Sequence, residues 1–411
     1  MQGPGRRRVS RIEIAKNMKK LLWVFCAVLV GLASCSKGYY VSDYDSYAEK
    51  SAGPRGGQGG QGRPGGQAGV LTAGEWNDLD NWGFWSGLMT SETYQDISGL
   101  WRFYTPRRVA VRVADPKGNR LPGIEVKLDN GRETLWTTRT DVFGEASLWV
   151  DPFHAEASAE GLSLLVGGVR INGTPKVTPW NVQQEEADVN IYTLDKNASV
   201  ENKADIAFIV DATGSMGDEI AFLKKDLQNI LDRVKGGVGQ VSLRTGAVFY
   251  RDEGDRYLTK SFNFTDDYRK TIQDIGMQEA DGGGDLPEAV HTALETGLQE
   301  LSWNASARAR IAFLILDAPA HRDHQGVIES LQASIRAYAK EGIKIIPVFC
   351  SSPSKECEFM CRFFAILTGG TYVFLTDDSG VGGDHIEASV GQFQIEPLND
   401  LLVRLIAKYI G

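Results

Sequence analysis

Three unbroken apolar runs in the C-terminal half most constrain how this 411-residue chain can fold. Residues 206–210 and 311–316 are apolar throughout, and residues 343–349 are nearly so. Strands without a polar face are those buried on both sides of a parallel sheet. We therefore expect a central parallel sheet that is covered by helices on both faces.

Three other segments carry apolar residues at helical spacing, which predicts amphipathic helices. Their apolar faces are Ile220, Leu223, Leu227, Ile230 and Leu231; Ala289, Ala293, Leu294, Leu298 and Leu301; and Leu398, Leu401, Leu402, Leu405 and Tyr409. Strands that alternate with helices form a doubly wound, Rossmann-like α/β sheet, which we predict for residues 203–411. Ligands of such folds bind outside the carboxyl ends of the strands.

Oxygen-bearing side chains follow the predicted strands at these carboxyl ends. Asp211, Thr213 and Ser215 come directly after the first run, and Asp317 follows the run at 311–316. Asp285 lies in the glycine-rich loop at residues 281–288, before a predicted helix. Carboxylate and hydroxyl oxygens are the ligands of hard cations. The alternative is a metal-free edge, where Thr213 and Ser215 cap a helix.

The order of the motifs DATGSM, GGGD-x-PE and LILDAPAH resembles the von Willebrand factor type A domain with its metal-ion-dependent adhesion site. The resemblance assigns the metal site to Asp211, Thr213, Ser215, Asp285 and Asp317. It implies that the hydroxyls and the second-loop residue touch the metal, that the strand-end aspartates act mostly through water, and that a partner's acidic residue fills an open position.

This chain has Asp285 at the second-loop position, where adhesion receptors of this family carry threonine. With Asp211, Asp285 and Asp317 ionised, a divalent cation is over-neutralised, to a net charge of about -1, and attracts a carboxylate less strongly. We expect tight metal retention and weaker capture of acidic ligands. Mg²⁺ suits a few protein oxygens with retained waters, and Mn²⁺ and Ca²⁺ remain alternatives.

The first 35 residues have the pattern of an export signal. A basic stretch precedes an apolar run at 21–33, which is shorter than the ~20 residues that span a bilayer. The end of this run, Leu32-Ala33-Ser34-Cys35, resembles the lipobox of bacterial lipoproteins, which implies lipidation of Cys35 and a place at the outer membrane or cell surface. Periplasm-facing attachment is an alternative, and Met18 is an alternative start.

Three segments connect the signal to the α/β part. Residues 36–75, rich in glycine, predict a flexible linker, and residues 76–105 are crowded with aromatic side chains. We interpret these rings as packed against a neighbouring domain; a carbohydrate or partner platform is the alternative. Residues 106–195 alternate apolar and polar positions between turn signals, which predicts an antiparallel β-sandwich. This segment resembles carboxypeptidase regulatory-like modules.

The net charge of -9 argues against a nucleic-acid surface. We expect a binding protein rather than an enzyme, whose partner is a protein or another macromolecule. The alternatives are a metal-dependent hydrolase accessory that uses His321, His324 and Asp317, and a metal-free structural component.

Several smaller features stay open. His321, Asp323 and His324 form either a zinc site or a polar loop. We interpret Glu288 as favouring a helix N-terminus, with a general base as the alternative. Three cysteines, Cys350, Cys357 and Cys361, allow at most one disulfide, whose partners the sequence does not identify.

Overall fold

The computed structural model describes residues 71–411 except 106, 180–187, 199, 285 and 378–384. The described residues belong to one compact unit. The predicted signal segment 1–35 with Cys35, residues 36–70 of the predicted linker, and Asp285 lie outside the described residues. None of the described helices is long and apolar enough to span a bilayer.

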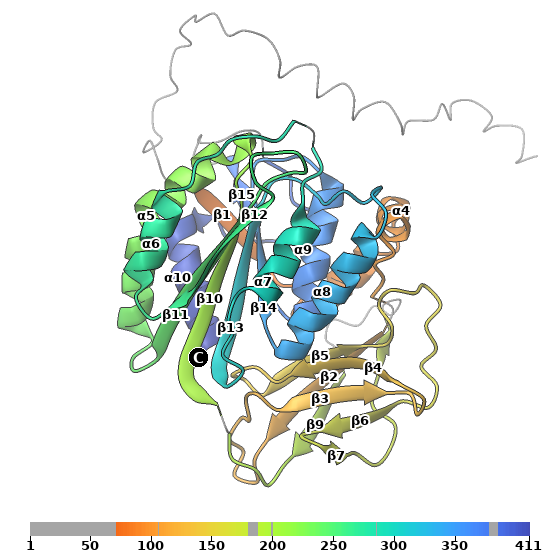
Figure 1. Cartoon of the computed structure of the whole chain (residues 1–411). Helices are drawn as coiled ribbons and strands as arrows, with labels where there is room; N and C mark the ends of the chain where they lie inside the picture. The colour runs from red at the N-terminus through yellow and green to blue at the C-terminus, as the bar shows by residue number, and fades with distance from the viewer. Residues whose placement is uncertain (1–70, 106, 180–187, 199, 285, 378–384) are drawn as a thin grey trace, which may run out of the picture. The chain divides into compact units, whose positions relative to one another are not determined.

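An eight-stranded, mostly parallel sheet forms the α/β part, with the order β12-β11-β10-β13-β14-β15-β1-β16 (Figure 1). The five central strands run parallel: β11 (Ser242–Tyr250), β10 (Glu201–Asp211), β13 (Ala307–Leu316), β14 (Lys344–Phe349) and β15 (Tyr372–Thr376). Two strands flank them in antiparallel pairing, β12 (Thr259–Thr265) beside β11 and β1 (Thr72–Trp76) beside β15. The short strand β16 (Glu396–Pro397) pairs in turn antiparallel with β1. The predicted parallel sheet is confirmed, because β10, β13 and β14 contain the three apolar runs.

Helices cover both faces of this sheet, as Figure 1 shows. One face carries α5 (Gly217–Gly237), α6 (Tyr268–Gly276) and α10 (Leu398–Ile410). The other carries α7 (Val290–Gln299), α8 (Val327–Glu341) and α9 (Lys355–Thr368). The predicted apolar faces therefore lie on α5, on α10 and on α7, with Ala289 and Leu301 just outside the ends of α7. Their residues are buried except Leu298, which is partly buried.

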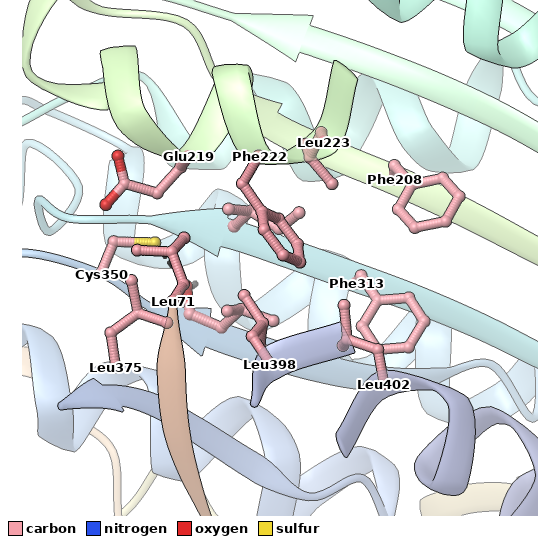
Figure 2. A pocket seen from close by; sticks show the side chains of 12 residues that line it. Leu71, Phe208, Glu219, Phe222, Leu223, Phe313, Cys350, Leu375, Leu398 and Leu402 are labelled. Carbon is pink, nitrogen blue, oxygen red and sulfur yellow. Dashed lines mark hydrogen bonds between the residues drawn. The ribbon is translucent and has the colours of Figure 1, made fainter. Parts of the chain in front are cut away.

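The space between the sheet and α10 is closely packed. Phe208 and Phe313 stack there with ring centroids 5.7 Å apart. Figure 2 shows the pocket that this pair helps to line, with Leu223 of α5 and Leu402 of α10 in its wall. Its cavity volume is about 10 Å³. A cavity needs roughly 10–15 Å³ to hold one water molecule. This pocket therefore has room for about one water molecule.

Residues 72–75 were predicted to belong to a flexible linker that ends at residue 75, but in the structure they form most of strand β1. Thr72–Trp76 pairs in antiparallel register with β15, from Thr72 opposite Thr376 to Trp76 opposite Tyr372. Ala73 packs on the α10 side, and the Leu71 carbonyl accepts a hydrogen bond from the Leu398 amide. The strand covers a flank of β15 that an open sheet would leave unpaired.

The aromatic segment contains α3 (Trp82–Leu88) and α4 (Glu92–Trp101). Trp85 stacks on Phe359 with centroids 5.9 Å apart, and Phe103 stacks on Phe363 at 4.5 Å. Both partners belong to α9, and all four rings are buried. The interpretation that these rings pack against a neighbouring domain is therefore confirmed for the buried ones; Phe84 remains 38% exposed.

Two four-stranded sheets form the smaller part. One contains β2 (Arg107–Ala114), β5 (Glu145–Trp149), β8 (Thr178–Pro179) and β9 (Val189–Thr193). The other contains β3 (Glu125–Asp129), β4 (Thr134–Arg139), β6 (Ser163–Val166) and β7 (Val169–Arg170). The predicted antiparallel pairing is confirmed for the other strand pairs of these two sheets, and β9 differs because it runs parallel to β2. Turn signals reveal hairpins, whereas a parallel pair needs a long crossover that has no such signal.

The three cysteines of the α/β part, Cys350, Cys357 and Cys361, are buried and carry free thiols. Cys357 and Cys361 are one turn apart on α9. The disulfide that the sequence allowed is therefore not formed among these residues.

Candidate metal centre at the carboxyl edge of the sheet

Two neighbouring strands deliver aspartates to the same edge of the sheet. Strands β10 and β13 are parallel, and Val210 lies opposite Ile315. Asp211 directly follows Val210, and Asp317 lies two residues after Ile315, so both reach this edge, where their exposed fractions are 0% and 6%. Two carboxyl groups are thus held in an interior that charged groups ordinarily avoid.

The loop after β10 folds around Asp211. Its Oδ1 accepts hydrogen bonds from the Thr213 amide at 2.9 Å and from the Thr213 hydroxyl at 2.7 Å. The Thr213 and Ser215 hydroxyl oxygens are 3.4 Å apart. Asp211 Oδ2 is buried and has no hydrogen-bond partner among the described residues. The loop is therefore ordered by one carboxylate oxygen, while the other remains available to a cation.

Hydrogen bonds tie this loop to the glycine-rich one. The Gly214 amide donates to the Gly282 carbonyl at 3.1 Å, and the Asp281 amide donates to the Ala212 carbonyl at 3.1 Å. Gly282 has a φ of 84°, in the left-handed region that favours glycine. The two loops are thus in direct contact at this edge.

Glu288 of the glycine-rich loop lies in the site, although the sequence analysis considered a role there only as the alternative. Its side chain is 3% exposed, and its amide donates to the Pro319 carbonyl at 2.8 Å. A Cβ added to Gly283 would lie 3.2 Å from Glu288 Oε1 and 3.2 Å from Thr213 Cβ, so the carboxylate and the threonine flank the same glycine. Glu288 directly precedes Ala289, the N-cap of α7, where the sequence analysis expected it to favour the helix N-terminus, and the structure shows in addition that its side chain is buried.

Buried carboxyl oxygens thus gather without matching donors. Glu288 Oε2, like the second oxygen of Asp211, lacks a hydrogen-bond partner within the described part of the chain. Asp252 and Asp255 add two more carboxyl groups from the loop after β11, where Asp255 Oδ2 accepts from the Gly283 amide at 2.9 Å. An acidic loop that follows a strand would have revealed this pair, but the sequence analysis did not identify β11.

Burial and mutual repulsion raise the pKa values of this cluster. Burial, with a further contribution from the Asp317 charge, raises the pKa of Asp211 to about 7. Burial, followed by the charges of Asp211 and Asp252, raises the pKa of Glu288 to about 10. Burial also raises the pKa of Asp317, against the hydrogen bond from Ser215. Such a cluster resists ionisation unless a positive charge joins it, and hard oxygen donors fit a divalent cation.

The geometry therefore brings together Asp211, Thr213, Ser215, Asp317 and Glu288, and Asp285 is not described. Metal coordination by these residues stays a prediction. The hydroxyls and carboxylates match the ligand preference of Mg²⁺ or Ca²⁺ better than that of metals that favour nitrogen or sulfur.

The raised pKa values predict how stability depends on pH. A carboxyl group whose pKa rises on folding stabilises the folded state below its unfolded pKa, and this contribution is lost as the pH climbs through the folded pKa. The melting temperature of EDTA-treated protein should therefore fall between pH 5 and about pH 8, through Asp211 with its pKa of about 7. Thermal unfolding monitored by circular dichroism measures this slope.

The effect of Mg²⁺ distinguishes the contribution of this carboxyl cluster to the pH dependence of stability from that of other buried acids. Glu219, whose burial raises its pKa to about 7, adds to the slope regardless of metal. A cation that binds only the folded state raises its stability by mass action, and here it binds best when the carboxyls are ionised. Mg²⁺ should therefore raise the melting temperature more at pH 8 than at pH 5. Equal shifts at both pH values would contradict the prediction.

Comparison with known proteins agrees with this fold. Residues 205–357 match the model of the von Willebrand factor A domain, so the chain contains such a domain after a small β region. The match covers Asp211, Thr213, Ser215, Glu288 and Asp317. It includes the strands β10, β11, β13 and β14 that build the edge described above.

Two curated proteins are similar to part of the chain. A putative ariadne-like RING finger protein R811 of Acanthamoeba polyphaga mimivirus is 34% identical over 117 residues, 28% of this chain and 11% of that protein. The alpha-protein kinase vwkA of Dictyostelium discoideum is 27% identical over 118 residues, 28% of this chain and 19% of that protein. The similarity thus spans under a fifth of each relative's length.

Two solved structures overlap with the fold. The pilus adhesin SpaC from Lactobacillus rhamnosus GG, in its open conformation, matches with a TM-score of 0.38 and 11% identity, over 52% of this chain and 30% of that chain. Proximal thread matrix protein 1 from the mussel byssus matches with a TM-score of 0.27 and 15% identity, over 42% of this chain and 47% of that chain.

Proposed function

We propose that the von Willebrand factor A domain of this chain binds one divalent cation at the edge formed by Asp211 and Asp317, and engages a macromolecular partner through it. One observation carries the proposal. Asp211 Oδ2 and Glu288 Oε2 are buried without a hydrogen-bond partner among the described residues, and the Glu288 carboxylate lies near the Thr213 side chain. Orphaned carboxyl oxygens are costly in a protein interior, and a bound cation offsets that cost.

The proposed ligands divide into two groups. Thr213, Ser215 and Glu288 would hold the metal, while Asp211 and Asp317 would act mostly through water, as the resemblance implies. Asp285 remains a further predicted ligand. Mg²⁺ is the proposed ion, because it suits a few protein oxygens and retains water, and Mn²⁺ or Ca²⁺ is the alternative.

Charge sets the kind of partner group that this site accepts. Asp211, Glu288 and Asp317 together carry more negative charge than one divalent cation neutralises, even before Asp285 is counted. The attraction for an incoming carboxylate is then weak. The site should retain its metal firmly and accept an oxygen ligand from the partner with little long-range steering.

The remaining proposals concern the whole chain. We infer a binding protein rather than an enzyme, attached through a lipid on Cys35 to a bacterial outer membrane or cell surface. Residues 36–70 would tether the folded unit, and the β-sandwich would act as a spacer. Incorporation of a labelled fatty acid, lost on Cys35→Ser, tests the anchor separately from the metal site.

A capture experiment tests the binding proposal. Purified full chain should retain a partner from an envelope extract in Mg²⁺ and release it in EDTA. Glu288→Gln should reduce capture at least tenfold, because it removes a ligand charge and keeps the side-chain size. The matched control is Glu160→Gln, a change at an exposed carboxylate of the small β part. Capture that is equal in Mg²⁺ and EDTA would overturn the metal-dependent mechanism.

A further inference from the structure

Three of the five histidines in the chain gather near one end of the sheet. His321 and His324 follow β13, and their rings stack with centroids 4.3 Å apart and an angle of 6° between the planes. His291, in the first turn of α7, lies close enough for both rings to influence its pKa. The nitrogen ligands distinguish this group from the all-oxygen centre of Asp211 and Glu288.

Ligand atoms of His321, Asp323 and His324 all lie within 4.8 Å of one another. The His321 ring is buried, whereas Asp323 and His324 are exposed. Ligands bonded to Zn²⁺ at about 2.0 Å in a tetrahedron are roughly 3.3 Å apart. The two exposed side chains can close this gap by rotating, while His321 keeps its position.

A carboxylate lies beside each of the two rings, and only that of Asp252 is within hydrogen-bond distance. His321 Nε2 is 2.6 Å from Asp252 Oδ1, and these side chains are 5% and 9% exposed. His324 Nδ1 is 3.7 Å from Glu253 Oε1. Metal-bound histidines commonly place a carboxylate behind the ring nitrogen that does not bind the metal, which fixes the tautomer and orientation. Asp252 thus fixes the His321 ring so that Nδ1 is the nitrogen offered to a metal.

We propose that His321, Asp323 and His324 form a second metal site, which takes Zn²⁺ or a similar imidazole-preferring cation. Two imidazoles and one carboxylate match the ligand preference of Zn²⁺, and the fourth position is open to solvent or to an outside ligand. The site is separate from the proposed Mg²⁺ centre, because it shares none of that centre's ligands. Asp252, which contacts the His321 ring, also adds negative charge near Glu288, so the two sites are neighbours that use different ligands.

Titration of the full chain in excess Mg²⁺ tests the second site. Excess Mg²⁺ fills the oxygen centre, so Zn²⁺ added in a calorimeter reports on the histidine cluster. Co²⁺ serves as a spectroscopic probe, because imidazole coordination changes its visible absorption. The expected result is one Zn²⁺ per chain, and an affinity that falls at least tenfold in His324→Ala.

The choice of variants keeps the outcome interpretable. His324 is 43% exposed at its side chain, so its replacement does not disturb the fold, whereas His321→Ala also leaves Asp252 unpaired. His154→Ala, at a ring that is 76% exposed beside Asp151, is the matched control and should leave Zn²⁺ binding unchanged. Glu288→Gln should weaken Mg²⁺ binding but not Zn²⁺ binding, so failure of one site is distinguishable from failure of the other.

Two results would overturn the proposal. One is the absence of Zn²⁺ and Co²⁺ binding in excess Mg²⁺. The other is Zn²⁺ binding that persists at full strength in His324→Ala, which would place the ion elsewhere on the chain.

Discussion

Glu288→Gln is expected to lower the affinity of the protein for Mg²⁺ by about 100-fold or more. Replacing a residue that only orients a ligand typically costs 10–100-fold in metal affinity, and a direct ligand should cost at least the upper value. Glutamine has the size of glutamate, so the packing beside Gly283 and Thr213 is kept while the ligand charge is lost. Calorimetric titration of EDTA-treated protein with Mg²⁺ measures the change.

Asp281 provides the matched control for this variant. It lies in the same glycine-rich loop, but its side chain is 69% exposed and pairs with Arg251 at 3.2 Å. Asp281→Asn should change the Mg²⁺ affinity less than about threefold, because exposed charges are screened by water and salt. Equal losses in the two variants would show a general electrostatic effect and not coordination by Glu288.

Arg362→Met is expected to lower the free energy of unfolding by about 3–5 kcal/mol, the cost of removing one partner from a buried ion pair. The Arg362 side chain is fully buried and donates to both Asp78 oxygens, from Nε at 2.9 Å and from Nη2 at 2.6 Å. Its Nη1 donates to the Ser389 carbonyl at 2.6 Å and lies 3.7 Å from Glu358 Oε1. Methionine would leave the buried Asp78 carboxylate without its charged partner.

The control for this change is an exposed pair. Arg102 and Glu329 are 2.6 Å apart, with side chains 47% and 60% exposed. Exposed pairs contribute ~0–1 kcal/mol, so Arg102→Met should have a small effect. Chemical denaturation of both variants gives the two values. A loss below about 1 kcal/mol in the free energy of unfolding of Arg362→Met would mean that this ion pair does not hold the segment around Asp78 against α9.

The central strands could be predicted from the sequence because strands buried on both faces leave a continuous apolar signal. Helix α9 gave no such signal, since it is buried on nearly every side, including Glu358 and Arg362, and so lacks an apolar stripe. Strand β1 is only five residues long and pairs with a strand about 300 residues away in the chain. Non-local pairing of this kind has no local sequence pattern.

The part of the candidate site that directly follows predicted strands could be predicted from the sequence. Asp211 and Asp317 were found because neighbouring parallel strands end at the same edge. The burial of Glu288 could not be predicted, because an acidic residue shortly before a helix has the same pattern whether it is exposed or buried. Only the three-dimensional structure shows that its carboxyl group is buried beside Thr213 and Gly283. Burial also sets the raised pKa values, which no spacing of residues reveals.

The most direct test of the metal centre is the anomalous diffraction of crystals grown with Mn²⁺ in place of Mg²⁺. We predict one strong peak about 2.1 Å from oxygens of Thr213, Ser215 and Glu288, a bond length typical of Mg²⁺ and close to that of Mn²⁺. No peak at this edge in Mn²⁺-saturated crystals, with the same side chains in place, would contradict the account.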